Sequence, residues 1–218
     1  MTFQTMVGLL GQSFLTTLSI FALTLLGSLP LGLLITFGRR SKFAPLRGIV
    51  KFYISIMRGT PLMLQLIVVF FLPNLAFGLT MPSNWRFTAV IVAFIINYAA
   101  YFAEIYRGGI ESIPVGQYEA AEVLGYSKNQ TFFKIILPQM VKRVLPSVTN
   151  EVITLVKDTS LAYAIGVVEM FTRAKQIAVA PNTPGFITLF VAGIFYYIFN
   201  FVVAWAMERI EKRLNYYQ

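Results

Sequence analysis

The chain has 218 residues, of which 57% are hydrophobic and only 12% charged, and its formal net charge is +9. Soluble domains carry about twice that charged fraction, and the apolar residues here form runs too long for ordinary core helices. This composition excludes a soluble globular domain and predicts an all-α, polytopic membrane protein. Cysteine and histidine are absent, which excludes disulfides, thiol nucleophiles and histidine-based metal or acid–base sites.

The apolar runs predict five transmembrane helices in a single domain of residues 1–218. The predicted spans are about 13–37, 59–77, 87–106, 146–166 and 186–207. No signal peptide is expected, because the N-terminal residues lack its basic and small-residue pattern. No Walker A pattern occurs, so binding of ATP through a P-loop is not expected.

A basic connector precedes the second span. Residues 39–58 carry apolar side chains at helical spacing, which is typical of an interfacial amphipathic helix. Gly59, Thr60 and Pro61 then predict a break or kink at the entry to the span.

A polar loop, residues 107–142, separates the third span from the fourth. The pair Gly108–Gly109 is predicted to end the third helix. Pro114 is placed to open a short helix that Gly125 closes. The stretch Ser127–Gln130 has the pattern of a capping box, which predicts another helical turn.

The distribution of positive charge predicts the orientation in the membrane. Basic residues concentrate in the connector, the polar loop with its flanks, and the C-terminal tail: Arg39, Arg40, Lys42, Arg47, Lys51, Arg58, Arg107, Lys128, Lys134, Lys142, Arg143, Lys157, Arg209, Lys212 and Arg213. The opposite side would hold only Arg86, Arg173 and Lys175. The positive-inside rule therefore predicts an N-terminus outside and a C-terminus in the cytoplasm, and it accounts for the net charge without nucleic acid.

The fourth predicted span contains two acids. Glu151 and Asp158 are seven residues apart and share a helix face with Thr154 between them. Acids within a span are costly and favour a transport pathway or ligand site. The alternative is internal neutralisation, in which Lys157 pairs with a carboxylate or Glu151 is wetted from the cytoplasm.

Other polar residues are candidate companions of these acids. Asn97, Tyr101 and Glu104 fall on one face of the third span. Side chains of this kind also form plain helix–helix hydrogen bonds, and Arg58 suits an interfacial anchor equally well. The predicted pathway set is Glu151, Asp158, Asn97, Gln65, Thr60, Arg58, Tyr101, Glu104, Thr154 and Ser160. No catalytic constellation is found.

The polar loop carries a pattern that resembles a known family. Glu119, Ala120, Ala121, Gly125, Ile135, Leu137 and Pro138 match, at full spacing, the EAA motif of ATP-binding-cassette (ABC) importer permeases. The stretches RGTPLMLQL (58–66), KDTSL (157–161) and NYAAYFAEIYRGGIESIP (97–114) are similar to the polar-amino-acid subfamily. The resemblance covers nearly the whole chain.

This resemblance implies a methionine-importer-like (type I) permease fold in the prokaryotic cytoplasmic membrane. It also implies a dimer with itself or a paralogue, separate ATPase subunits that hold ATP and Mg, and an extracytoplasmic binding protein that delivers an amino acid. The chain itself is then expected to bind no cofactor or metal. The residues expected to couple to the ATPase are Tyr118, Glu119, Ala120, Ala121, Leu124, Gly125, Leu137 and Pro138.

The leading hypothesis is thus the transmembrane subunit of an ATP-driven importer, with no enzymatic activity of its own. The acids of the fourth span favour a basic amino acid (Arg, Lys or His) as substrate. Glutamine or another polar amino acid stays open. A self-sufficient secondary transporter or channel, and a non-transporting membrane anchor, are the alternatives from other classes.

Overall fold

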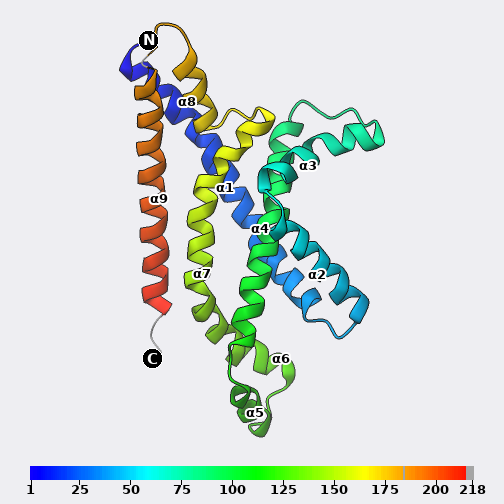
Figure 1. Cartoon of the computed structure of the whole chain (residues 1–218). Helices are drawn as coiled ribbons and strands as arrows, with labels where there is room; N and C mark the ends of the chain where they lie inside the picture. Colours follow the sequence, from blue (N-terminus) through cyan, green and yellow to red (C-terminus); the bar gives the residue numbers. More distant parts are fainter. Residues whose placement is uncertain (184, 215–218) are drawn as a thin grey trace.

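The computed structural model describes residues 1–183 and 185–214 and shows a helical protein throughout that part (Figure 1). Pro184 and the last four residues of the predicted domain lie outside the described residues. The elements are α1 (Phe3–Arg39), α2 (Ala44–Gly59), α3 (Leu62–Phe77), α4 (Trp85–Glu111), α5 (Val115–Val123), α6 (Lys128–Gln130), a π-helical turn (Thr131–Ile136), α7 (Leu137–Asp158), a 3₁₀ segment (Thr159–Ile165), α8 (Met170–Val179) and α9 (Phe186–Leu214).

Within the described residues, α1, α4 and α9 are long and apolar enough to cross a membrane. The pair α2–α3 makes a fourth if its two helices form one broken span, bent by 112°. Helix α7 has 22 residues, about 33 Å at 1.5 Å per residue, so its length suffices, but it carries more charge than an ordinary span. The predicted count of five spans therefore stays a prediction.

Helices α1 and α4 pack through small residues. The buried positions of α1 repeat every three or four residues and are mostly Ser, Thr and Gly. A Cβ at Gly32 would lie 2.8 Å from Phe102 Cβ, and the Thr36 hydroxyl donates to the Ala103 carbonyl at 3.1 Å. Such contacts are typical of helix packing in membranes, where the backbones approach closely.

The break between α2 and α3 falls at the predicted residues. Helix α2 ends at Gly59, and α3 begins at Leu62 after Pro61. Proline cannot donate a backbone hydrogen bond, so the carbonyls before it need other partners. The Gln65 amide supplies them by donating to the Met57 and Thr60 carbonyls at 3.0 and 3.1 Å.

Helix α4 does not end at Gly108–Gly109, and that prediction was wrong. The helix continues to Glu111. A Cβ at Gly109 would lie 2.1 Å from Val144 Cγ1 and 3.0 Å from Met140 Cγ. Gly109 therefore serves close packing between α4 and α7 rather than helix termination.

The polar loop folds as predicted in its middle and differs at its end. Pro114 precedes α5, and Gly125 follows it with φ of +77°, a left-handed conformation that glycine adopts without strain. The Ser127–Gln130 capping box is present. Helix α7 begins at Leu137, nine residues before the predicted start of the fourth span, because Pro146 is accommodated inside the helix.

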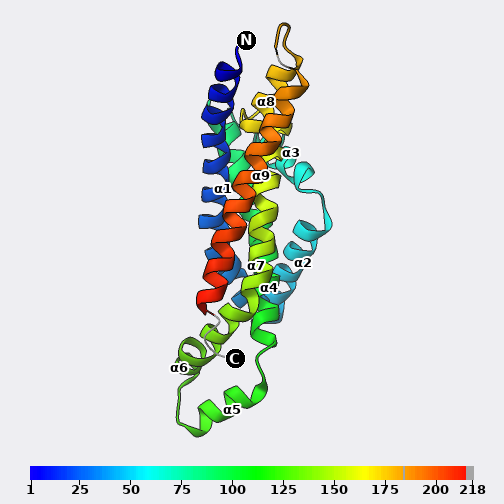
Figure 2. The same ribbon diagram turned by 90° about the vertical axis from the view of Figure 1, so that its left-hand side faces the viewer.

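The segment after α7 is anchored by a buried acid. Glu169 is fully buried and caps the N-terminus of α8 by accepting from Phe171 and Thr172 backbone N–H groups at 2.8 and 2.7 Å. The Tyr196 hydroxyl of α9 also donates to it at 3.0 Å. Burial raises the pKa of the Glu169 carboxyl, and the two backbone hydrogen bonds oppose that rise. The carboxyl thus joins α8 to α9, which run side by side in Figures 1 and 2.

Candidate functional site

The first group of predicted polar residues lies where α2, α3 and α4 meet. The buried Asn97 amide donates to Gln65 Oε1 at 2.9 Å and to the Met57 carbonyl at 3.1 Å. Gln65 in turn donates to Thr60 Oγ1 at 2.8 Å. The structure thus brings Asn97, Gln65 and Thr60 together as one hydrogen-bonded group that stabilises the break between α2 and α3.

The second group joins α4 to α7. The Tyr98 hydroxyl, on a side chain that is only 2% exposed, donates to Asp158 Oδ2 at 2.8 Å. Glu151 and Thr154 lie on the same helix as Asp158, and all three are half-buried. Ser160, in the segment after α7, donates to the Lys157 carbonyl instead.

Tyr98 is a functional candidate that sequence reasoning missed. Asn97 and Asp158 were both selected, but no local pattern indicated that Tyr98 pairs with Asp158, 60 positions away. The only available hint was an aromatic hydroxyl within a span, a group that usually finds a partner when buried.

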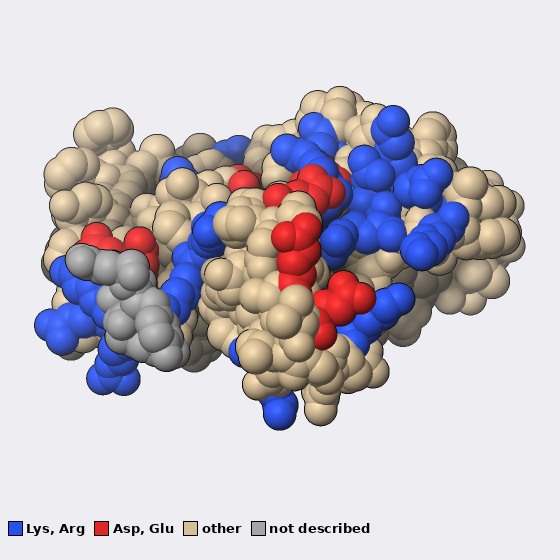
Figure 3. All heavy atoms as spheres, turned by 90° about the horizontal axis from the view of Figure 1, so that it is seen from below, with Lys and Arg blue, Asp and Glu red and all other residues tan. Residues whose placement is uncertain are grey.

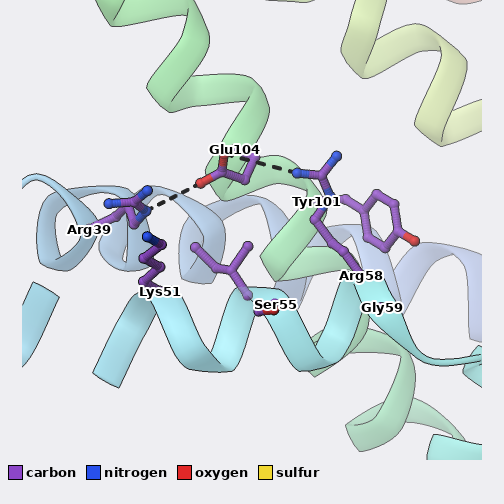
Figure 4. Close-up of a pocket in the computed structure, with 8 residues that line it drawn as sticks. Arg39, Lys51, Ser55, Arg58, Gly59, Tyr101 and Glu104 are labelled. Carbon is purple, nitrogen blue, oxygen red and sulfur yellow. Dashed lines mark ion pairs between the residues drawn. The ribbon is translucent and has the colours of Figure 1, made fainter. Parts of the chain in front are cut away.

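The third group surrounds Glu104 at the junction of α1, α2 and α4. The Glu104 carboxylate lies 2.7 Å from Arg107, 3.5 Å from Arg39 and 3.9 Å from Arg58. Arg58 also stacks over Tyr101, with 5.4 Å between the guanidinium carbon and the ring centre. Figure 4 shows Glu104 between Arg39 and Arg58, with Lys51 of α2 rising beside Arg39 and Ser55 at the α2 ribbon.

Arg58 connects the second and third groups. It interacts electrostatically with Glu151 of α7 as well as with Glu104 of α4. Glu104 and Tyr101, predicted as companions of Asn97, instead lie beside the basic residues of α1 and α2. The polar residues of α4 therefore divide between two environments.

The polar loop projects from one end of the bundle and includes α5 and α6 (Figures 1 and 2). Gln139 of α7 donates to Gln117 of α5 at 3.2 Å, and Arg143 of α7 donates to the Ser112 carbonyl. The first bond attaches α5 to α7, the helix that carries Glu151 and Asp158, and the second attaches the end of α4 to α7.

The EAA residues take different positions on this loop. Glu119, Ala120 and Leu124 are exposed, whereas Ala121 is 1% exposed and packs inside the chain. Ala121 therefore packs α5 against the rest of the chain, and its side chain is not exposed to a partner. Tyr118 and Leu137 are half-buried, and Pro138 is exposed in the first turn of α7.

Metal ligation finds no support in the described residues, which contain no group of three or more Asp, Glu, His or Cys side chains that would hold an ion. The candidate site consists of Glu151 and Asp158 of α7 with Tyr98 of α4. The basic residues around Glu104 lie next to it, and the polar loop is attached to α7 by Gln139.

Residues 28–216 match the model of a protein family described as the binding-protein-dependent transport system inner membrane component. The chain belongs to this family. It is the permease subunit of an amino acid ABC importer, a multi-pass protein of the cytoplasmic membrane, and a transport component rather than an enzyme.

Curated relatives cover most of the permease. The L-cystine transport system permease protein TcyB of Bacillus subtilis is 37% identical over 92% of this chain and 84% of its own length. The arginine transport system permease protein ArtQ of the same organism is 36% identical, with 91% and 89% covered. A putative glutamine transport system permease protein GlnP of Rickettsia bellii is 34% identical, with 92% and 90% covered.

Solved structures share the permease fold. A crystal structure of an amino acid ABC transporter with histidines superposes with a TM-score of 0.86 at 29% identity, covering 98% of this chain and 99% of the other. An inward-facing structure of the MetNI methionine ABC transporter superposes at 0.74 with 20% identity, covering 99% and 100%. These matches confirm the expected all-helical, methionine-importer-like fold.

Proposed function

We propose that this permease translocates a basic amino acid, with Glu151 and Asp158 as the groups that receive its cationic side chain. The observation that carries the proposal is the pair of half-buried carboxylates on α7, one of which is held by the Tyr98 hydroxyl at 2.8 Å. The similarity to ArtQ, a permease of an arginine transport system, supports a basic substrate.

Physical chemistry favours a cation over a neutral side chain at these acids. A carboxylate in a span is costly unless it is paired, and Tyr98 satisfies only one oxygen of Asp158. A guanidinium or ammonium group supplies the missing donors and the countercharge. Glutamine would satisfy hydrogen bonds without neutralising the charge, and an acidic amino acid would be repelled.

The substrate carboxylate would be bound from the opposite side, at the break between α2 and α3. Arg58 lies in the last turn of α2 and interacts electrostatically with Glu151. Thr60 and its neighbouring backbone lie beside it. An amino acid placed between α7 and this break would have each charged end facing an opposite charge, with Tyr101 and Asn97 nearby on α4.

Transport would follow an alternating-access cycle in a permease dimer with five spans per chain, the N-terminus outside and the C-terminus in the cytoplasm. Separate ATPase subunits, which hold the ATP and Mg, would act on exposed Glu119 and Leu124 of the EAA loop. The hydrogen bonds from Gln139 and Arg143 would pass that movement to α7. An extracytoplasmic binding protein would deliver the substrate.

The test is reconstitution of the permease with its ATPase and binding protein in proteoliposomes. We expect ATP-dependent uptake of arginine, lysine or histidine, and a loss of roughly tenfold or more in Asp158→Asn, from an effect of about 1.5–3 kcal/mol per charged hydrogen bond. Glu208→Gln, an exposed carboxylate on α9, is the matched control and should retain uptake. Preferential uptake of glutamine, or full uptake by Asp158→Asn, would contradict the proposal.

The same preparation separates the coupling role from the substrate site. Glu119→Lys and Gly125→Asp should abolish stimulation of ATP hydrolysis by loaded binding protein while the permease still folds. Normal stimulation in both variants would refute coupling through this loop. Uptake that persists without ATP and follows an ion gradient would instead indicate a secondary transporter.

A further inference from the structure

A cavity between α1, α2 and α4 carries three cationic side chains in its lining. Its volume is about 470 Å³, and its lining includes Arg39, Lys51 and Arg58 against the single carboxylate of Glu104. Small-molecule sites usually occupy about 300–1,000 Å³. The cavity therefore has the size of a ligand site and a surplus of positive charge.

The donors in this cavity are incompletely used. Within the described residues, the Lys51 ammonium makes no hydrogen bond or ion pair. Arg39 Nε is buried and makes no hydrogen bond, although it lies 3.5 Å from Glu104 Oε1. Arg58 approaches its carboxylate partner only to 3.9 Å. Three cationic side chains thus converge on one space with donors to spare.

Glu104 neutralises these cations only in part. Its closest partner is Arg107, at 2.7 Å, which lies outside the cavity lining and also pairs with Glu111 at 2.5 Å. The carboxylate is therefore already engaged by a fourth cation. An anion supplied from outside the chain would complete the charge balance of the cavity.

Helix α2 has three distinct faces, and two of them indicate what kind of ligand the cavity binds. One face packs on α1 and α4 through Ile54 and its neighbours, and a second carries Lys51, Ser55 and Arg58 into the cavity. The third face exposes Ile49, Phe52 and Ile56, of which Ile49 and Phe52 are each 68% exposed. The helix therefore offers an anion site and an adjoining apolar strip, which matches a ligand with a charged head and an apolar chain.

We propose that this cavity binds one anionic phospholipid. Lys51 and Ser55 receive its phosphate, and the apolar strip of Ile49, Phe52 and Ile56 receives an acyl chain. Figure 3 shows Lys and Arg gathered on the side of the molecule where Figure 1 places α2, so the approach to the cavity is also basic. The proposal is independent of the transported substrate.

The apolar strip favours a lipid over free phosphate, and the charge of the cavity favours an anionic lipid over a zwitterionic one. Inorganic phosphate would satisfy the cations but leave the apolar strip of α2 uncovered. A zwitterionic lipid would cover the strip but bring its own cation into a cavity that already has an excess. Each Lys or Arg near an anionic headgroup contributes about 1 kcal/mol, which corresponds to about a fivefold change in affinity.

The test is native mass spectrometry of the purified full-length chain in detergent, titrated with phosphatidylglycerol or with phosphatidylcholine of the same acyl chains. We expect preferential binding of phosphatidylglycerol. Lys51→Gln should weaken it about fivefold and Lys51→Arg should restore it. Lys42→Gln, an exposed lysine outside the cavity lining, should stay within about twofold of the wild type, since its charge is farther from the headgroup.

A second variant tests the apolar half of the site. Phe52→Gln should weaken phosphatidylglycerol binding while leaving the cations intact. Lys51→Gln changes an exposed position, so it should not impair folding. Equal binding of both lipids, or equal loss in Lys51→Gln and Lys42→Gln, would overturn the proposal. So would displacement of the lipid by inorganic phosphate with the same dependence on Lys51, because it would assign the cavity to a free anion.

Discussion

Tyr98→Phe removes one hydroxyl from the contact between α4 and α7. The hydroxyl donates to Asp158 Oδ2 at 2.8 Å, and the ring is only 2% exposed and packs against Phe94 and Phe102. Phenylalanine preserves that packing, so the change isolates the hydrogen bond. A hydrogen bond to a charged group contributes about 1.5–3 kcal/mol.

Loss of that bond should release Asp158 from its orientation toward the substrate. The energy corresponds to about a tenfold to hundredfold change in an equilibrium. We expect the rate of ATP-dependent uptake, at saturating loaded binding protein, to fall by about tenfold. The amount of permease that co-purifies with its ATPase should be unchanged.

Tyr106→Phe is the matched control, because Tyr106 is on the same helix and stacks on Phe102 while its hydroxyl makes no hydrogen bond among the described residues. Uptake by this variant should stay within about twofold of the wild type, the scale of a surface change. Equal uptake by both variants would refute the positioning role of Tyr98. A loss of assembly in Tyr98→Phe would show that the bond acts in folding instead.

Further predictions concern packing, the loop and the buried acid. Gly109→Ala should lower the free energy of unfolding by about 1–3 kcal/mol through overpacking. Gly108→Ala, with open space around its Cβ position, should be neutral or stabilising. Equal thermal midpoints of the two variants would contradict the packing role of Gly109. Gly125→Ala should cost about 1–2 kcal/mol because its φ is +77°, and Gly116→Ala in α5, where no such strain exists, should not; thermal unfolding in detergent measures both. Glu169→Gln should destabilise the permease by about 1–3 kcal/mol, since an amide cannot accept all the donors that converge there; an unchanged midpoint would show that the cap is dispensable.

Local signals predicted local structure well. The break at Gly59 to Pro61 and the capping box at Ser127 depend on a few adjacent residues, and both are present. Gly125 follows the same logic, since a left-handed residue after a helix is a local requirement. These features could be predicted because their physical cause lies within one or two turns of chain.

Tertiary packing explains the predictions that were wrong. Gly108–Gly109 has the pattern of a helix end, but Gly109 is required by the side chains of α7, which lie about 30 residues later in the sequence. The fourth span was predicted to begin at about residue 146, but Pro146 lies inside α7, as proline often does in membrane helices when neighbours satisfy the freed groups. The pairing of Tyr98 with Asp158 likewise depends on how α4 meets α7, which no local pattern records.

The hydrogen bonds of the site also indicate which parts of the permease move together. Asn97 joins α4 to α2 and α3, and the Tyr53 hydroxyl of α2 donates to the Ile96 carbonyl of α4 at 2.5 Å. These hydrogen bonds hold the bent pair α2–α3 and α4 together, so we expect the three helices to move as one rigid unit rather than to bend at the break. Helices α4 and α7 meet through buried apolar packing, the close approach at Gly109 and, among the described residues, the hydrogen bond from Tyr98 to Asp158. Because Gln139 attaches the EAA loop to α7, we expect movement of that loop to reach the helix that carries Glu151 and Asp158, and hence its contact with α4.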